Sequence, residues 1–104
     1  MPEIEPMNRR DPAYDRHVLF MELALAQAAA AALVGEVPIG AVVVIGDDVV
    51  GLASNGPIHR CDPTAHAEVL ALREASRRVG NYRLPGATIY VTVEPCCMCV
   101  GAMM

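Results

Sequence analysis

The chain has 104 residues, 54% of them apolar, and a formal net charge of −4. This length fits one small domain with a single core, and the apolar content argues against an intrinsically disordered protein. The charge excludes a general electrostatic attraction to nucleic acids or anionic membranes, so any contact with RNA requires a local basic patch. All 8 basic residues are arginine, and there is no lysine.

The first residues suggest an arm followed by a long helix. Residues 1–10 are polar and punctuated by proline, which predicts a loose N-terminal arm before a domain over residues 11–104. Asp11-Pro12 is typical of a helix start, because aspartate caps a helix and proline suits its first position. Gly35 is expected to end this helix.

The same stretch has to be distinguished from a targeting signal. Arg9-Arg10 followed by an apolar, alanine-rich segment resembles an export signal or a membrane span. Asp15, Glu22 and Gln27 interrupt the segment, which favours an ordinary buried helix. We therefore expect no membrane and a cytoplasmic protein, in which a cysteine cluster indicates metal binding or catalysis more often than disulfides.

The remaining elements alternate between strands and helices. "PIGAVVVIGDDVVGLASN" predicts a hairpin that turns at Gly46-Asp47-Asp48. A second helix is predicted from Asp62-Pro63 to Val79, a third strand over residues 87–93, and a third helix within "PCCMCVGAMM". The order αββαβα predicts a layered α/β domain, in which the third strand follows a helical crossover and lies parallel to a neighbour.

Four polar side chains at two helix starts form a candidate metal centre. His66 and Glu68 open the second helix, and Cys96 and Cys99 open the third. One imidazole and two thiolates make a three-ligand zinc set, and a fourth position open to water is typical of catalytic rather than structural zinc. The helix N-termini favour the thiolate forms of the cysteines.

His66 and Glu68 are two residues apart, so they cannot lie on one face of a helix. Side chains lean toward a helix's N-terminus, so a zinc ion just beyond that end can be approached from both sides of the axis. Under this arrangement His66 binds the metal, while Glu68 stays off it and moves the proton of a water activated by the zinc. The pattern indicates hydrolysis.

The motifs "PTAHAE" and "EPCCMC" resemble the zinc-dependent nucleoside deaminase superfamily, which has an H-x-E and P-C-x-x-C pattern. "EVPIGAVVV", "NGPIHRCDPTAHAEVLALREA" and "NYRLPGATIYVTVEPCCMC" are similar to bacterial tRNA-specific adenosine deaminases, from about residue 13 to the end. The resemblance implies the αββαβα portion of a three-layer α/β/α cytidine deaminase-like fold. It also implies a hydrolase acting on an amidine C–N bond, which converts the wobble adenosine of a tRNA anticodon loop to inosine and works as a homodimer.

The resemblance also assigns roles to matching positions. Glu68 would carry protons from the water to the adenine ring and then to the departing amine. Asn55 would hydrogen-bond the base, because an amide offers both a donor and an acceptor to adenine, although an asparagine in "SNGP" also suits a turn. Backbone groups near Ala67 and Pro95 would contact the base. Zn²⁺ would be held by His66, Cys96 and Cys99.

Other functions remain open at this point. A Cys-x-x-Cys at a helix start also occurs in thioredoxin-like redox proteins. A structural zinc module that binds a partner would need a fourth ligand, such as Cys61 or Cys97. Within the superfamily, the alternative is a deaminase of free guanine or cytosine.

Two further features of the sequence concern RNA binding and the length of the catalytic domain. His59, Arg60 and Arg83 are candidates for contact with RNA phosphates, although surface charge is the commoner role of such residues. Family members continue past the position of Met104 for about a third of their length, so we expect a catalytic domain that lacks the C-terminal third. An inactive fragment is therefore a further alternative.

Overall fold

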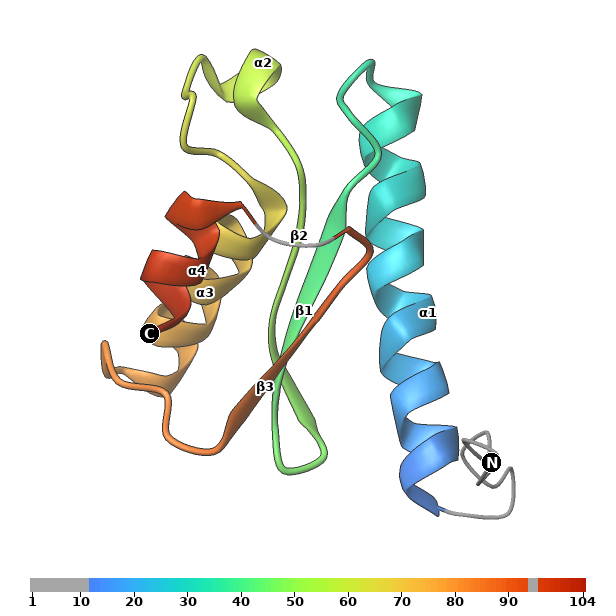
Figure 1. The fold of residues 1–104 in the computed structure, drawn as a ribbon, viewed down its shortest axis with the longest axis vertical. Helices are drawn as coiled ribbons and strands as arrows, with labels where there is room; N and C mark the ends of the chain where they lie inside the picture. The colour runs from blue at the N-terminus through green and yellow to red at the C-terminus, as the bar shows by residue number, and fades with distance from the viewer. Residues whose placement is uncertain (1–11, 94–95) are drawn as a thin grey trace, which may run out of the picture.

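The computed structural model describes residues 12–93 and 96–104. The predicted arm over residues 1–10 lies outside these ranges. The elements in chain order are α1 (Pro12–Leu33), β1 (Gly40–Ile45), β2 (Asp48–Ser54), α2 (Pro57–Arg60), α3 (Ala67–Val79), β3 (Ala87–Val91) and α4 (Cys97–Met103). They form three layers, with α1 on one face of a three-stranded sheet and α3 and α4 on the other (Figure 1).

The side chains of the central strand β1 alternate between the two helical layers. Val42 and Val44 pack with Phe20 and Ala24 of α1 and with Tyr90 of β3. Because successive side chains of a strand point to opposite faces, their neighbours in β1 face the other helix. The two faces of this one strand therefore organise two separate hydrophobic clusters.

The second cluster joins the sheet to the helix that carries the candidate site. Ala41 and Val43 of β1 pack with Ala67, Ala71 and Ala75 of α3, and all five are buried. Alanine at these positions lets α3 approach the strands closely. The first turn of α3 is therefore fixed against the centre of the sheet.

The long helix α1 begins and ends as the sequence predicts. It starts at Pro12, and Gly35 follows it with a left-handed φ of 78°. By length and composition, Tyr14–Leu33 could cross a membrane, with a mean hydropathy of 1.2, although core helices of soluble proteins pass the same test. Phe20, Ala24, Ala28 and Ala31 form the buried stripe by which this helix packs on the sheet, and 22% of its apolar window is buried.

The second predicted helix begins later than expected. Asp62 does not start it: its side-chain Oδ1 accepts hydrogen bonds from the backbone N–H and the hydroxyl of Thr64, at 2.8 and 2.7 Å. Such a bond to the residue two positions on closes a local turn instead of a helix. The prediction of a start at Asp62-Pro63 was therefore wrong, and α3 begins at Ala67 with His66 as its N-cap.

The direction of the third strand also differs from the expectation. The sheet order is β2-β1-β3, and β3 pairs antiparallel with β1, for example Val43 with Ile89. Since β1 is also antiparallel to β2, the crossover through α3 does return β3 in the direction of β2. However, it places β3 on the far side of β1, so the prediction of a parallel neighbour was wrong.

Gly40 at the start of β1 is a position where a side chain has no room. A Cβ there would lie 2.6 Å from the backbone nitrogen of Ala28 and would overlap the carbonyl oxygen of Ala24 even more severely. Both obstacles belong to the backbone of α1 and cannot rotate away. We expect Gly40→Ala to lower the free energy of unfolding by about 3 kcal/mol or more in urea titrations.

A matched control for this substitution lies in α4. A Cβ at Gly101 would meet no atom within 4 Å, and alanine favours a helix over glycine. Gly101→Ala should therefore leave the stability unchanged or raise it slightly. Equal stability of the Gly40→Ala and Gly101→Ala variants would contradict the close packing of α1 on β1.

Candidate metal centre

Three side chains bring their ligand atoms together at the ends of two helices. His66 Nδ1 lies 3.6 Å from Cys96 Sγ and 3.5 Å from Cys99 Sγ, and the two sulfurs are 3.6 Å apart. A tetrahedral zinc ion with ordinary bond lengths holds a sulfur and a nitrogen about 3.6 Å apart and two sulfurs about 3.8 Å apart. The donor atoms thus fit the spacing that zinc requires.

The local backbone explains how these side chains converge. His66 is the N-cap of α3 and Cys96 is the N-cap of α4, both in extended conformation. Cys99 is in the first turn of α4 and is fully buried. The two helix starts therefore meet at the metal centre, as the sequence predicts.

The protonation of the cysteines is uneven in the metal-free chain. Burial, with a hydrogen bond to Cys96 and the negative charge of Glu68, raises the pKa of Cys99 to about 12. Hydrogen bonds from the backbone and side chain of Cys99 lower the pKa of Cys96. Because zinc binds thiolates, its binding has to displace the proton that Cys99 retains.

Glu68 lies beside the ligand set but outside it. Its side chain is buried, with 4% of its surface exposed, and its hydrogen bond and charge both act on Cys99. It belongs to α3 itself, whereas His66 caps the helix from outside. This difference explains how residues two positions apart can both reach the centre.

Of the three residues predicted to contact the substrate base, the structure describes Asn55 and Ala67. Asn55 is buried, and its Oδ1 accepts a hydrogen bond from the backbone N–H of Ala67 at 3.2 Å. That bond occupies the Ala67 N–H, so the Asn55 amide nitrogen is the donor left for a substrate. Pro95 lies outside the described residues.

The two remaining cysteines do not join the metal centre. Cys61 and Cys97 are exposed, and Cys61 Sγ contacts the carbonyl oxygen of Ile58 at 3.7 Å. Within residues 12–93 and 96–104, the one group of three or more potential ligands is His66, Cys96 and Cys99. The structure therefore offers no fourth protein ligand from these ranges for a closed structural zinc site.

Comparison with known proteins shows which family this chain belongs to. The family described as "Cytidine and deoxycytidylate deaminase zinc-binding region" matches residues 15–104. The chain belongs to this family. Its predicted zinc cofactor is thereby confirmed, and the thioredoxin-like alternative, which leaves His66 and Glu68 without a role, is not favoured.

Individual relatives within this deaminase family have more specific names. The chain is 48% identical over 90 residues to the tRNA-specific adenosine deaminase of Buchnera aphidicola subsp. Schizaphis graminum, covering 86% of this chain and 60% of that protein. It is 46% identical over 86 residues to the tRNA-specific adenosine deaminase of Bacillus subtilis, covering 83% and 53%. The chain thus spans little more than half the length of these relatives.

Solved structures of deaminases confirm the cytidine deaminase-like fold. One, from studies of A-to-I editing by tRNA:A34 deaminases at the wobble position of transfer RNA, superposes with a TM-score of 0.81 at 48% identity, covering 83% of this chain and 62% of that one. The guanine deaminase of Bacillus subtilis superposes with a TM-score of 0.80 at 38% identity, covering 84% and 56%.

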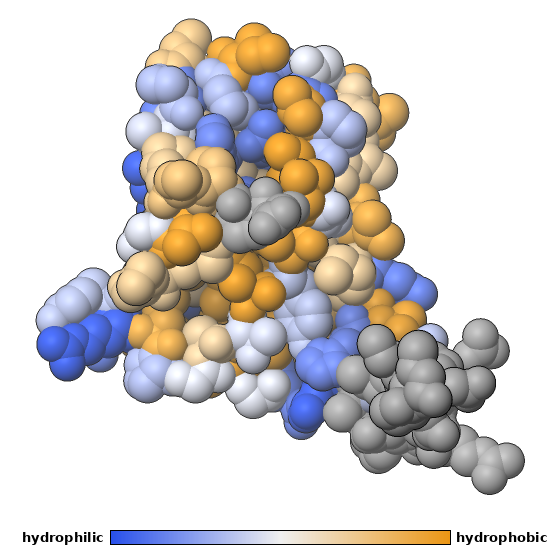
Figure 2. Space-filling view, in the orientation of Figure 1, coloured by the Kyte–Doolittle hydropathy of each residue, from blue (hydrophilic) through white to orange (hydrophobic). Residues whose placement is uncertain are grey.

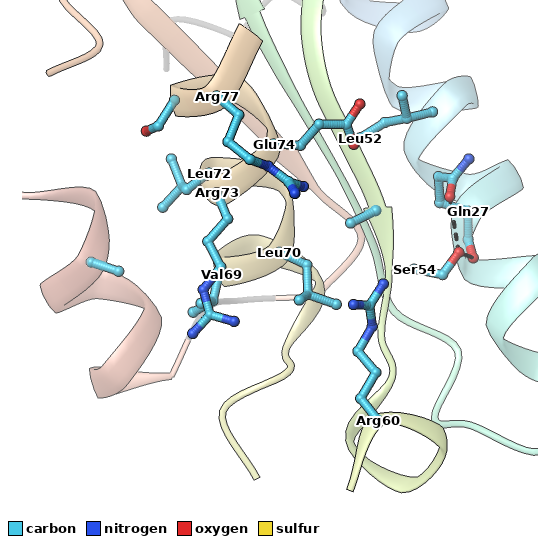
Figure 3. A pocket seen from close by; sticks show the side chains of 13 residues that line it. Gln27, Leu52, Ser54, Arg60, Val69, Leu70, Leu72, Arg73, Glu74 and Arg77 are labelled. Atoms are coloured by element: carbon cyan, nitrogen blue, oxygen red, sulfur yellow. Dashed lines mark hydrogen bonds between the residues drawn. The ribbon is translucent and has the colours of Figure 1, made fainter. Parts of the chain in front are cut away.

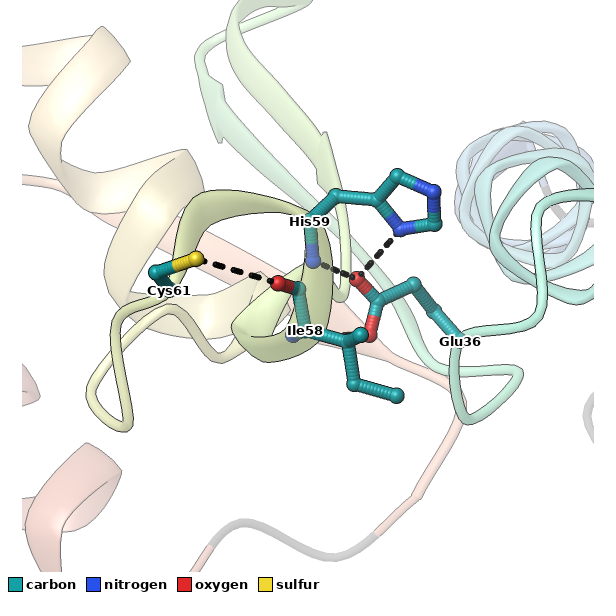
Figure 4. A network of polar contacts seen from close by, with 4 residues as sticks. All are labelled: Glu36, Ile58, His59 and Cys61. Atoms are coloured by element: carbon teal, nitrogen blue, oxygen red, sulfur yellow. Dashed lines mark hydrogen bonds and ion pairs between the residues drawn. The ribbon is translucent and has the colours of Figure 1, made fainter.

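A buried carboxylate, Glu36, lies in the segment "EVPIGAVVV" but has no role that its sequence context predicts, and it supports the site of this deaminase domain. Glu36, in the loop after α1, accepts hydrogen bonds from the backbone N–H groups of Ile58 and His59, at 3.1 and 2.9 Å, and contacts His59 Nδ1 at 3.1 Å (Figure 4). It caps α2, whose own N-cap, Gly56, has no side chain. Glu36 thereby holds the segment that joins Asn55 to His66.

Glu36 is expected to make stability depend on pH. Burial raises the pKa of Glu36, but hydrogen bonds from His59 and Ile58 outweigh it and hold the pKa below the ordinary 4.5. A carboxyl group whose pKa is lowered by folding stabilises the fold fully above its unfolded pKa, and this contribution disappears as the pH falls through the folded pKa. The stability difference between wild type and Glu36→Gln should therefore be constant above about pH 5 and shrink below pH 4.5.

Urea titrations at several pH values measure this difference, and hydrogen exchange at Ile58 and His59 reports the local effect. Glu22→Gln is the matched control, since Glu22 is exposed on α1. A stability difference for Glu36→Gln that stayed constant down to pH 3 would contradict the assigned hydrogen bonds.

Proposed function

We propose that this chain forms the catalytic centre of a hydrolase that converts adenosine to inosine at the wobble position of a tRNA anticodon. The observation that carries the proposal is the buried carboxylate of Glu68 beside, and not within, the three-ligand set of His66, Cys96 and Cys99. Similarity to tRNA-specific adenosine deaminases at 48% identity supports the substrate.

The chain's own residues suit the reaction adenosine plus water to inosine plus ammonia. Bound zinc supplies a Lewis acid that lowers the pKa of a water molecule. Glu68 would accept one proton of the attacking water and pass it to a ring nitrogen of adenine. It would then take the remaining proton of the added hydroxyl group and deliver it to the departing amine, so that the carbonyl of inosine forms and ammonia leaves. The Asn55 amide nitrogen donates a hydrogen bond that orients the base, while its oxygen stays on Ala67.

The proposal includes a homodimer. β3 is an edge strand, since it pairs only with β1 among the described strands. On the adjoining surface, apolar side chains gather over α4 (Figure 2), where Met98 and Val100 are exposed. A second copy could cover this edge and surface, which sedimentation of the purified chain would reveal.

Several broader expectations belong to the same proposal. We propose a cytoplasmic protein without a membrane role, since α1 packs on the sheet through Phe20 and Ala24. Residues 11–104 would form the catalytic domain, and residues 1–10 an arm. The segment that relatives carry beyond the matched region would complete the substrate site.

The substrate can be tested directly. The zinc-loaded chain is incubated with an anticodon stem-loop carrying a wobble adenosine, and in parallel with free guanine and free cytosine. We expect inosine in the stem-loop and no ammonia from the free bases. Ammonia from guanine, without inosine in the RNA, would overturn the proposal in favour of a free-base deaminase, whose fold is equally similar.

A further inference from the structure

A groove outside the metal centre runs between the edge strand β2 and helix α3. It has a volume of about 890 Å³. β2 is the outer strand of the sheet on this side, so the groove opens along an uncovered edge. Figure 3 shows Arg60 reaching toward it from α2, with Arg73 and Arg77 extending from α3.

The groove is positively charged although the whole chain has a net charge of −4. Glu74 is its one acidic lining residue in the described part of the chain, and it is paired with Arg78 at 2.7 Å. Arg73 lies 3.8 Å from Asp62, a loose contact. Arg77 has no ion-pair partner among the described residues, and Arg60 makes no direct ion pair there but acts through its charge on Asp62, as Arg73 does. Three arginines near the carboxylates of Asp62 and Glu74, the latter taken up by Arg78, leave an excess of positive charge.

The three arginines form a row whose first member lies near the segment that leads to the metal centre. Arg60 ends α2, shortly before the turn that leads to His66. Arg73 and Arg77 are four residues apart, so they lie on one face of α3 and about 6 Å apart along its axis. The row thus begins near the end of α3 that carries the metal centre and leads away from it.

We propose that this arginine groove binds phosphates of the RNA strand next to the adenosine at the metal centre, an inference that rests on the proposed function. Guanidinium groups bind phosphate oxygens in a bidentate manner, and such contacts fix the position of a nucleic acid without reading its sequence. Gln27 also lines the groove, and its amide nitrogen can donate to the same ligand, whereas the Ser54 hydroxyl already donates to the oxygens of Gln27 at 2.7 and 2.9 Å.

A second copy of the chain fits this groove less well. In a symmetric dimer the same surface is present on both subunits, so each groove would have to be matched by acidic side chains of that shared surface, and the groove itself offers only Glu74 among its described lining residues. The charge of Arg77, which has no ion-pair partner among the described residues, would then be buried without compensation. An RNA backbone supplies the negative charges that the groove lacks.

The test compares RNA binding by four versions of the chain: wild type, Arg60→Ala, Arg77→Ala and Arg16→Ala. Arg16 is the matched control, because it pairs with Asp47 at 2.8 Å on a different part of the surface and its loss removes the same charge. Fluorescence anisotropy with a labelled anticodon stem-loop is measured at several salt concentrations. Zinc content and sedimentation are recorded for each variant.

We expect Arg60→Ala and Arg77→Ala each to weaken binding and to reduce the slope of log affinity against log salt by about 0.7 to 0.9, with Arg16→Ala like wild type. Unchanged slopes in the groove variants, or no binding by wild type, would overturn the proposal. A changed sedimentation mass with unchanged slopes would overturn it in favour of a contact between copies.

RNA binding and inosine formation, measured together, distinguish a failure of the proposed deaminase activity from a failure of the proposed phosphate-binding groove. If wild type binds the stem-loop with the expected arginine dependence but forms no inosine, the groove stands and the activity is wrong. If inosine forms at the wild-type rate in both arginine variants at low salt and with RNA below saturation, where phosphate contacts contribute most, the activity stands and the groove is wrong.

Discussion

Replacing Glu68 by glutamine is expected to leave zinc bound and to slow inosine formation by about 10² to 10⁴-fold. Glutamine has nearly the same shape but cannot accept and return a proton. Glu68 is outside the ligand set, so its replacement removes no ligand. Single-turnover assays on the anticodon stem-loop, with metal analysis of the same samples, measure both effects.

Glu22→Gln provides the comparison for this prediction, because it makes the same chemical change on the exposed surface of α1. Its activity should equal that of wild type. Full activity of Glu68→Gln with zinc bound would rule out Glu68 as the proton carrier. Loss of zinc from Glu68→Gln would instead indicate that the carboxylate supports the ligands.

Cys99→Ala should lose zinc and, with it, stability. Cys99 is fully buried between α4 and α3 and supplies one of three donor atoms. Removing a hydrogen bond that supports a zinc ligand costs about 10 to 100-fold in metal affinity, and removing the ligand itself should exceed that. Because zinc that binds only the folded state stabilises it, the melting temperature should fall as well.

The neighbouring Cys97→Ala variant is the matched control. Cys97 is two residues away in the same helix, but it is exposed and outside the ligand set. It should keep a full zinc content and an unchanged melting temperature. Equal zinc loss in both variants would show that Cys97 also binds the metal.

The sequence predicts a candidate metal centre at His66, Cys96 and Cys99 because these residues follow local spacing rules. A histidine and a glutamate at the start of one helix, and two cysteines three residues apart at the start of another, indicate metal chemistry by their residue types and spacing. The distances between His66, Cys96 and Cys99 agree with that interpretation. The turn of the hairpin was similarly visible, since Gly46 has a left-handed φ of 62°.

Two features depended on contacts that no local pattern reveals. Asp11-Pro12 and Asp62-Pro63 carry the same helix-start signal, but the Asp62 side chain closes a turn with Thr64, and α3 starts only at Ala67. The partner of β3 was also hidden, because a crossover fixes the direction of a strand but not how many strands it passes.

Glu36 was missed for a related reason. It is a single acidic residue in "GEVPIG", and its partners Ile58 and His59 lie more than 20 residues away in the sequence. A buried carboxylate that caps a distant helix leaves no periodic signal, and the motif "EVPIGAVVV" that begins with Glu36 does not by itself indicate which groups the carboxylate contacts. Such supporting residues become visible only when the fold brings the two loops together.

The most direct test of the central claim is zinc K-edge X-ray absorption of the purified chain, with the metal content measured in parallel. An open centre built from His66, Cys96 and Cys99 predicts one zinc per chain, with two sulfur ligands at about 2.3 Å and nitrogen or oxygen ligands at about 2.0 to 2.1 Å. Three or more sulfur ligands, or a chain that folds without binding zinc, would contradict it.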